Sequence, residues 1–123
     1  MGPTVLLCDE SMFTRMVIAG MLLNEGYEVI GEATSGEEAV REFALLRPRI
    51  IILDLILPGM NGIAATRRIR ELDQSVRILV VSAVTQDAMV DDVMAAGANA
   101  FLEKPPVRER LLKTLFKLAP IDS

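Results

Sequence analysis

The sequence predicts a single α/β domain over residues 1–123, built on a five-stranded parallel sheet. Short apolar segments alternate along the chain with longer amphipathic ones, as expected for strands that alternate with helices. The apolar run at residues 50–53 shows no polar–apolar alternation, which is typical of a strand buried on both faces of a parallel sheet. Hydrophobic residues make up 51% of the chain, enough for one well-packed core.

Ten elements are expected, and several helix ends are marked by residues that begin or end helices. In order they are strand 4–8, helix 12–25, strand 27–33, a helix that opens at 35–38 and stops before 48, strand 50–53, helix 62–72, strand 76–81, helix 86–96, strand 100–102 and helix 107–118. Ser35 and Glu38 have the spacing of a capping box, and Asn61 is an expected N-cap. Gly26 and Gly97 are expected helix terminators.

Apolar spacing predicts which faces of the first and last helices are buried. In the first helix, Phe13, Val17 and Met21 recur at helical spacing. In the last helix, the residues expected to face the core are Val107, Leu111, Leu115 and Leu118, with Leu112 and Phe116 completing it.

Composition excludes several classes of function. The chain has no histidine, so histidine-based catalysis is absent and a zinc site is not expected. Its net charge is −4 and its basic residues are scattered, so it offers no nucleic-acid surface. The single cysteine, Cys8, excludes an internal disulfide and indicates a reducing, cytoplasmic compartment. No apolar run reaches membrane-spanning length, so membrane insertion is not expected.

Polar side chains follow four of the expected strands. Asp9 and Glu10 follow the first strand and Asp54 the third, while Ser82 and Lys104 follow the fourth and fifth. In the flavodoxin-like order 2-1-3-4-5, the first and third strands lie side by side, and ligands bind at the carboxyl ends of the strands. The sequence therefore predicts a flavodoxin-like (βα)5 fold that gathers these five side chains at one edge.

The gathered residue types suit phosphoryl chemistry. Oxygen ligands without His or Cys favour Mg²⁺, with Mn²⁺ as an alternative. Lys104 and Ser82 supply a cation and a hydroxyl group for phosphoryl oxygens, and Asp54 is the candidate nucleophile. Each residue alone has an ordinary explanation as a helix start, a turn residue or a surface charge. Their shared position at four strand ends favours a site.

The chain resembles the receiver domains of bacterial response regulators, most closely the single-domain chemotaxis type. The motifs are Asp9-Glu10-Ser11, the run DLILPGMNG at residues 54–62, Ser82-Ala83 and Lys104-Pro105, and the similarity covers essentially the whole chain. The resemblance implies a two-component signalling switch that is not a classical enzyme but takes part in its own phosphorylation and dephosphorylation. In this family the acceptor, here Asp54, takes phosphate from a phosphohistidine of a sensor histidine kinase.

The resemblance also implies roles for the other site residues. Asp9, Glu10, Asp54 and the backbone carbonyl of Ile56 would gather Mg²⁺, and Lys104 and Ser82 would contact the phosphoryl group. Phe101 would be the aromatic switch residue that turns inward when Ser82 moves, and a cis peptide bond would precede Pro105. Glu10 stands where a second Asp is frequent, Phe101 lacks the hydroxyl of a switch Tyr, and Pro106 replaces a frequent aromatic residue.

The expected output is the binding of a downstream protein. In the family, the signalling surface is formed by the elements expected here at residues 86–96, 100–102 and 107–118. We expect a monomer, with a dimer as the alternative. Ile56 and Val84 occupy positions that flank the path of the attacking water in the family, and both are apolar. The phosphorylated form is therefore expected to be long-lived and to rely on a separate phosphatase or on return of phosphate to a kinase.

Three alternatives remain open from the sequence. An FMN-binding protein of this fold needs a phosphate-cradling loop after the first strand, where Asp9 and Glu10 would repel phosphate. A small-molecule phosphatase with an aspartate nucleophile usually needs a second acid soon after it, where this chain has Leu55 and Ile56. The third alternative is a receiver-like module that binds partners without phosphorylation.

Overall fold

The computed structural model describes residues 2–121 and confirms the predicted fold class. Five parallel strands form one sheet in the order β2-β1-β3-β4-β5. The elements are β1 (Thr4–Cys8), α1 (Met12–Leu22), β2 (Glu28–Ala33), α2 (Gly36–Leu46), β3 (Ile50–Leu53), α3 (Gly62–Leu72), β4 (Arg77–Ser82), α4 (Asp87–Ala95), β5 (Ala100–Glu103) and α5 (Arg108–Leu118). The domain predicted over residues 1–123 includes Met1, Asp122 and Ser123, which lie outside the described residues.

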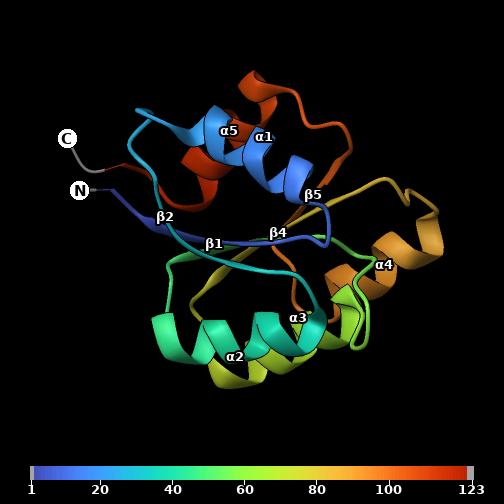
Figure 1. Ribbon diagram of the computed structural model, residues 1–123. Helices are drawn as coiled ribbons and strands as arrows, with labels where there is room; N and C mark the ends of the chain where they lie inside the picture. The colour runs from blue at the N-terminus through green and yellow to red at the C-terminus, as the bar shows by residue number, and fades with distance from the viewer. Residues whose placement is uncertain (1, 122–123) are drawn as a thin grey trace.

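Helices cover both faces of the sheet. Helices α1 and α5 lie on one face, and α2, α3 and α4 lie on the other (Figure 1). Alternate residues of each central strand enter the two cores: Val5 and Leu7 pack beneath α1 and α5, whereas Leu6 and Cys8 pack beneath α2 and α3. This arrangement explains why the run at Ile50–Leu53 shows no alternation, since all four of its side chains are buried.

Strand register brings the expected site residues to one edge. Cys8 of β1 and Val80 of β4 both pair with Leu53 of β3. The pairing continues past the strand ends, because the Asp54 N–H donates to the Cys8 carbonyl at 2.9 Å and the Lys104 N–H donates to the Ser82 carbonyl at 2.9 Å. Asp54 and Lys104 therefore begin their loops from fixed backbone positions.

Two of the predicted helix starts are confirmed by their hydrogen bonds. The Ser35 hydroxyl accepts from the Glu38 N–H at 3.1 Å, and the Asn61 side chain accepts from the Ala64 N–H at 2.9 Å. The Glu38 carboxylate accepts from the Thr34 N–H at 2.7 Å, one residue earlier than a standard capping box places it. Both caps satisfy N–H groups that have no partner within the helix.

The first helix is shorter than predicted, and other boundaries agree to within one residue. Helix α1 ends at Leu22 rather than at residue 25, and Leu23 already has an extended conformation. Asn24 then adopts a left-handed conformation with φ 62°, which Asn tolerates better than most residues. Gly26 also has a positive φ but lies beyond the end of the helix.

The predicted buried faces of α1 and α5 are partly wrong. Ile18 and Leu22 face the core, whereas Phe13 is 74% exposed. Helix α1 carries apolar residues on more than one side, so spacing alone fits two faces. In α5, Leu111 and Leu115 are buried as predicted, but Phe116 is 55% exposed and Val107, which precedes the helix, is 63% exposed.

Between residues 2 and 121, no helix is long and apolar enough to cross a membrane.

Candidate functional site

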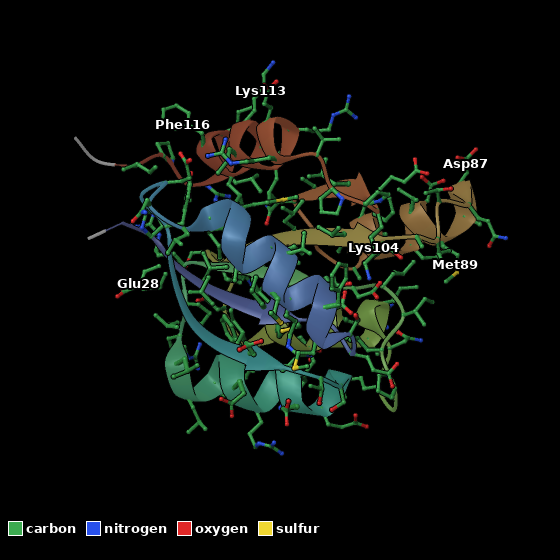
Figure 2. The ribbon with its side chains drawn as sticks, turned by 45° about the horizontal axis from the view of Figure 1, so that its top comes forward. Glu28, Asp87, Met89, Lys104, Lys113 and Phe116 are labelled. Atoms are coloured by element: carbon green, nitrogen blue, oxygen red, sulfur yellow. The ribbon has the colours of Figure 1, made fainter. Side chains whose placement is uncertain are left out.

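Three charged side chains meet at the carboxyl edge of the sheet. The Lys104 ammonium donates to Asp9 Oδ2 at 2.7 Å and to Asp54 Oδ2 at 2.9 Å. All three side chains are largely buried, with exposures of 19% for Lys104, 8% for Asp9 and 12% for Asp54. Figure 2 shows Lys104 on the same side of the molecule as Asp87 and Met89 of α4, away from Phe116 and Glu28. One lysine thus bridges acids that follow β1 and β3.

Backbone groups hold the other oxygen of each carboxylate. Asp9 Oδ1 accepts from the Ser11 N–H at 2.8 Å, and Asp54 Oδ1 accepts from the Ile56 N–H at 3.2 Å. Burial alone lowers the pKa of Lys104, but its hydrogen bonds to the two carboxylates and their charges outweigh burial and raise that pKa overall. The lysine therefore stays charged, and the two carboxylates share its positive charge.

The remaining predicted residues lie around this cluster. Ser82 is fully buried, and its hydroxyl oxygen accepts from the Val84 N–H at 3.1 Å. Phe101 is half-buried and packs against the core beneath α2, α3 and α4. Glu10 is exposed, and in the described part of the chain its carboxylate makes no hydrogen bond or ion pair. The structure therefore brings Asp9, Asp54 and Lys104 into contact and leaves Glu10 outside that contact.

The donor set at this edge fits a hard cation. Within residues 2–121, no three carboxylate, thiol or imidazole groups converge as a ready-made metal site. Two carboxylates, Asp9 and Asp54, do converge, and the exposed Glu10 is the next residue in the chain after Asp9. A site with one or two carboxylates suits Mg²⁺, which retains several of its waters in proteins. Asp9 and Asp54 would hold the ion, with Glu10 and the carbonyl of Ile56 as the further candidates.

Glycine is required where the loop after Asp54 turns into α3. A Cβ atom at Gly62 would lie 2.4 Å from the Asp54 carbonyl oxygen and 2.7 Å from the Leu55 Cα atom. The Gly62 N–H also donates to the Leu55 carbonyl at 2.7 Å. Residue 62 therefore packs directly against the backbone of the candidate acceptor.

On the other side of the site, the Lys104–Pro105 peptide bond is cis, as the resemblance implied.

Arg15, which the sequence did not single out, contacts the loop that carries Asp9 and Glu10. Its guanidinium group donates to the carbonyl oxygens of both residues and to the carboxylate of Glu32 on β2. The available signal was a single arginine within the largely apolar segment 12–23. Spacing from Asp9 alone did not indicate a contact with backbone carbonyls.

We expect the stability of the protein to fall with pH from about pH 8.5, because of Cys8. Burial, with the charges of Glu38 and Asp9, raises the pKa of the Cys8 thiol. The unfolded chain loses this proton first, so the stabilising contribution is complete below the unfolded pKa and is lost above it. The expected loss is about 1.4 kcal/mol per pH unit.

Urea denaturation at several values between pH 7 and 10 measures this effect. Cys8→Ala is the control: it lowers stability through a cavity but removes the slope between about pH 8.5 and 10. Tyr27, through burial, and Lys104 also have raised pKa values, and they add to the loss only above about pH 10. Equal slopes for both proteins in this window would refute the assignment to Cys8.

Comparison with known proteins identifies the class to which this fold and site belong. The family model described as the response regulator receiver domain matches residues 5–116. The chain therefore belongs to the response regulator receiver family, and the resemblance seen in the sequence is confirmed.

Individual relatives extend along nearly the whole chain. The chemotaxis protein CheY of Thermotoga maritima is 41% identical over 119 residues, which cover 97% of this chain and 99% of that protein. The CheX–CheY–BeF3–Mg complex from Borrelia burgdorferi matches with a TM-score of 0.89 and 32% identity, covering 94% of this chain and 87% of the other. The receiver domain of the sensor histidine kinase PA1611 of Pseudomonas aeruginosa, solved with magnesium in its active-site cleft, has a TM-score of 0.86 and 31% identity over 96% of this chain and 98% of the other.

Proposed function

We propose that this protein is a phosphoryl-accepting switch of a two-component system, with Asp54 as the acceptor. The observation that carries the proposal is the shared contact of Lys104 with Asp54 and Asp9 at the carboxyl edge of the sheet. Membership in the receiver family supports the proposal, because the family match spans residues 5–116 and so includes all three of these residues. We also propose that residues 1–123 form one cytoplasmic receiver domain, which is monomeric.

The reaction is the transfer of a phosphoryl group from a histidine to a carboxylate. An oxygen of Asp54 forms a bond to phosphorus, and the phosphorus–nitrogen bond of the donor phosphohistidine breaks. The electron pair stays on the imidazole nitrogen, which takes up a proton from water. The Lys104 ammonium nitrogen lies 2.9 Å from Asp54 Oδ2, at the end of a flexible side chain. It can therefore donate to the phosphoryl oxygens in place of the carboxylates.

A divalent cation would neutralise charge on the phosphoryl oxygens during the transfer. Asp9 and Asp54 supply the converging carboxylates, and the exposed side chain of Glu10 is free to reach the same edge. The magnesium ion in the cleft of the PA1611 receiver domain supports this assignment for the present chain.

Phosphorylation is proposed to change a surface away from Asp54. The buried Ser82 hydroxyl lies at the end of β4, and Phe101 of β5 is the half-buried aromatic residue beside that strand, paired in register with Val80. Movement of Ser82 toward the phosphoryl group would let Phe101 turn inward. A coupling free energy of about 1–3 kcal/mol between the two sites is enough for such a switch.

The face formed by α4, β5 and α5 is proposed to bind the downstream protein. It joins two types of charge: Asp87, Asp91 and Asp92 are exposed on α4, and Arg110, Lys113 and Lys117 are exposed on α5. Phe116 is a further exposed aromatic residue on α5, although the sequence predicted it as part of the core and Figure 2 shows it away from α4. An exposed aromatic residue among charged ones is typical of a protein interface.

A second surface, beside Lys104, suits the binding of a protein that donates the phosphoryl group. An apolar groove of about 320 Å³ opens beside Lys104 and is lined by Phe13, Thr14, Val17, Ala83, Pro105 and Pro106. Phe13 and Met16 are 74% and 64% exposed, and Ile56, two residues after the acceptor, is 52% exposed. Apolar side chains around the entrance suit contact with another protein surface, such as a sensor histidine kinase or a phosphatase. The CheX–CheY complex of Borrelia shows that a related receiver forms a protein complex.

One observation favours the alternative of a module that binds partners without phosphorylation. Lys104 already pairs with both carboxylates, so its charge offsets part of their mutual repulsion without a metal ion. Incubation with acetyl phosphate and Mg²⁺, followed by mass spectrometry of intact protein and peptides, separates the two functions. One added phosphate on the peptide that contains Asp54 is the expected result. Complete absence of labelling at high donor concentration would favour the alternative.

A further inference from the structure

Arg15 is a largely buried cation beside the predicted metal-binding acids. Its side chain is 12% exposed. The guanidinium Nη1 donates to the Asp9 carbonyl at 2.6 Å and to the Glu10 carbonyl at 3.3 Å, while Nε donates to Glu32 Oε1 at 2.6 Å. One planar group thus joins α1 to β2 and to the loop between β1 and α1. The fixed fork of a guanidinium makes several such bonds at once, which a lysine ammonium cannot reproduce in the same geometry.

These contacts fix the backbone from which the two acids project. The Asp9 and Glu10 carbonyls belong to the peptide groups on either side of Glu10. The Ser11 N–H, in the second of these groups, donates to Asp9 Oδ1 at 2.8 Å. Ser11 also caps α1, since its hydroxyl oxygen accepts from the Thr14 N–H at 3.2 Å. A change in the orientation of either peptide group would move the Asp9 carboxylate as well as the direction of the Glu10 side chain.

The charge of Arg15 has the opposite effect from its hydrogen bonds. A positive charge beside the site disfavours binding of a second cation, and the Glu32 carboxylate offsets part of this repulsion. If only charge mattered, removal of Arg15 would strengthen cation binding. If positioning of the loop dominates, removal of Arg15 would weaken it. The sign of the change therefore distinguishes the two roles.

We propose that Arg15, anchored by Glu32, is a positioning residue that holds Asp9 and Glu10 in the geometry needed for divalent-cation binding. The proposal rests on the proposed function, in which these acids hold Mg²⁺. Residues that orient metal ligands without touching the metal typically change affinity by about 10–100-fold when they are replaced. Three hydrogen bonds to a nearly buried guanidinium make an effect of this size reasonable here.

The test is a Mg²⁺ titration of the full, unphosphorylated chain, followed through backbone amide NMR shifts. Arg15→Met keeps most of the side-chain length and removes the charge, whereas Arg15→Lys keeps the charge and removes the fork. Both variants are expected to bind Mg²⁺ about tenfold or more weakly than wild type. Arg41→Met is the control and should leave the affinity unchanged, because Arg41 is 62% exposed and, within residues 2–121, its one ion pair is with Glu38 on the same helix.

Tighter binding by Arg15→Met, or wild-type affinity in Arg15→Lys, would overturn the proposal. Circular dichroism checks that each variant is folded. If Arg15→Met does not fold, the Mg²⁺ affinity of Arg15→Lys alone tests the proposal. Hydrogen exchange of the Ser11 amide without metal gives an independent measurement, and faster exchange is expected in both Arg15 variants but not in Arg41→Met. Failure of the wild type to bind Mg²⁺ would refute the proposed function, whereas unchanged Ser11 exchange would refute the role of Arg15.

Discussion

Asp54→Asn is expected to abolish phosphate uptake while leaving the fold intact. The amide has nearly the same shape as the carboxylate, and its single oxygen can keep one of the two bonds, either from the Ile56 N–H or from Lys104, which bond to different oxygens of Asp54. It lacks the negatively charged oxygen that attacks phosphorus, so the nucleophile is lost. Lys104 remains paired with Asp9 at 2.7 Å, which limits the effect on stability. No covalent phosphate should be detected by mass spectrometry after incubation with acetyl phosphate and Mg²⁺.

A matched substitution on the surface gives the comparison. Asp91→Asn removes the same charge from an exposed position on α4 that takes no part in the Lys104 contacts, and it should take up phosphate at the wild-type rate. Uptake by Asp54→Asn at the same rate as Asp91→Asn would mean that the acceptor has been assigned incorrectly. A uniform loss of uptake in both variants would point to a general effect of net charge.

The phosphorylated protein is expected to decay at least tenfold faster when Ile56→Asn and Val84→Glu are combined. Hydrolysis requires a water that is held in line with the bond to phosphorus, and a positioned acid or base typically contributes about 10²–10⁴-fold. The native side chains cannot hydrogen-bond a water. Their backbone N–H groups bond to Asp54 Oδ1 at 3.2 Å and to the Ser82 hydroxyl at 3.1 Å, so the new polar groups would start next to the site.

Decay after removal of the phosphodonor should be followed for the single and double variants. Ile56 is 52% exposed and Val84 is half-buried, so the Ile56 variant should fold without difficulty and can be interpreted alone. Leu45→Asn, at a position that is 72% exposed on α2, controls for a polar substitution of an exposed apolar residue. Unchanged or slower decay in the double variant would show that the apolar pair does not set the lifetime.

The fold was predictable because its strongest signals are local. The central strands are continuous apolar runs, and residues such as Asn61 mark helix starts with a side chain that bonds to the next turn. Parallel order then places the ends of β1, β3, β4 and β5 at one edge. Asp9, Asp54 and Lys104 could be grouped on this basis before any distance was known, since strand ends in one sheet leave few other arrangements.

Features that depend on tertiary packing were not predictable. Helix α1 has apolar residues on several sides, so helical spacing alone does not determine which of them are buried. Ile18 is buried and Phe13 is exposed because of the way in which the helix packs on the sheet. The contacts of Arg15 with two carbonyl oxygens leave no pattern in the sequence, because every residue has a carbonyl group. The position of the Glu10 side chain, outside the Lys104 contacts, likewise depends on the turn between β1 and α1.

The bridge formed by Lys104 has a consequence for how the protein matures. The lysine lies 95 residues after Asp9 and 50 residues after Asp54, so the site depends entirely on long-range chain closure. At synthesis rates of about 5–20 residues per second, Lys104 is made roughly 3–10 s after Asp54. During that interval, a chain with β1 and β3 already paired holds two facing carboxylates without their cation. Docking of the short edge strand β5 relieves this repulsion, so completion of the site and completion of the sheet are one event.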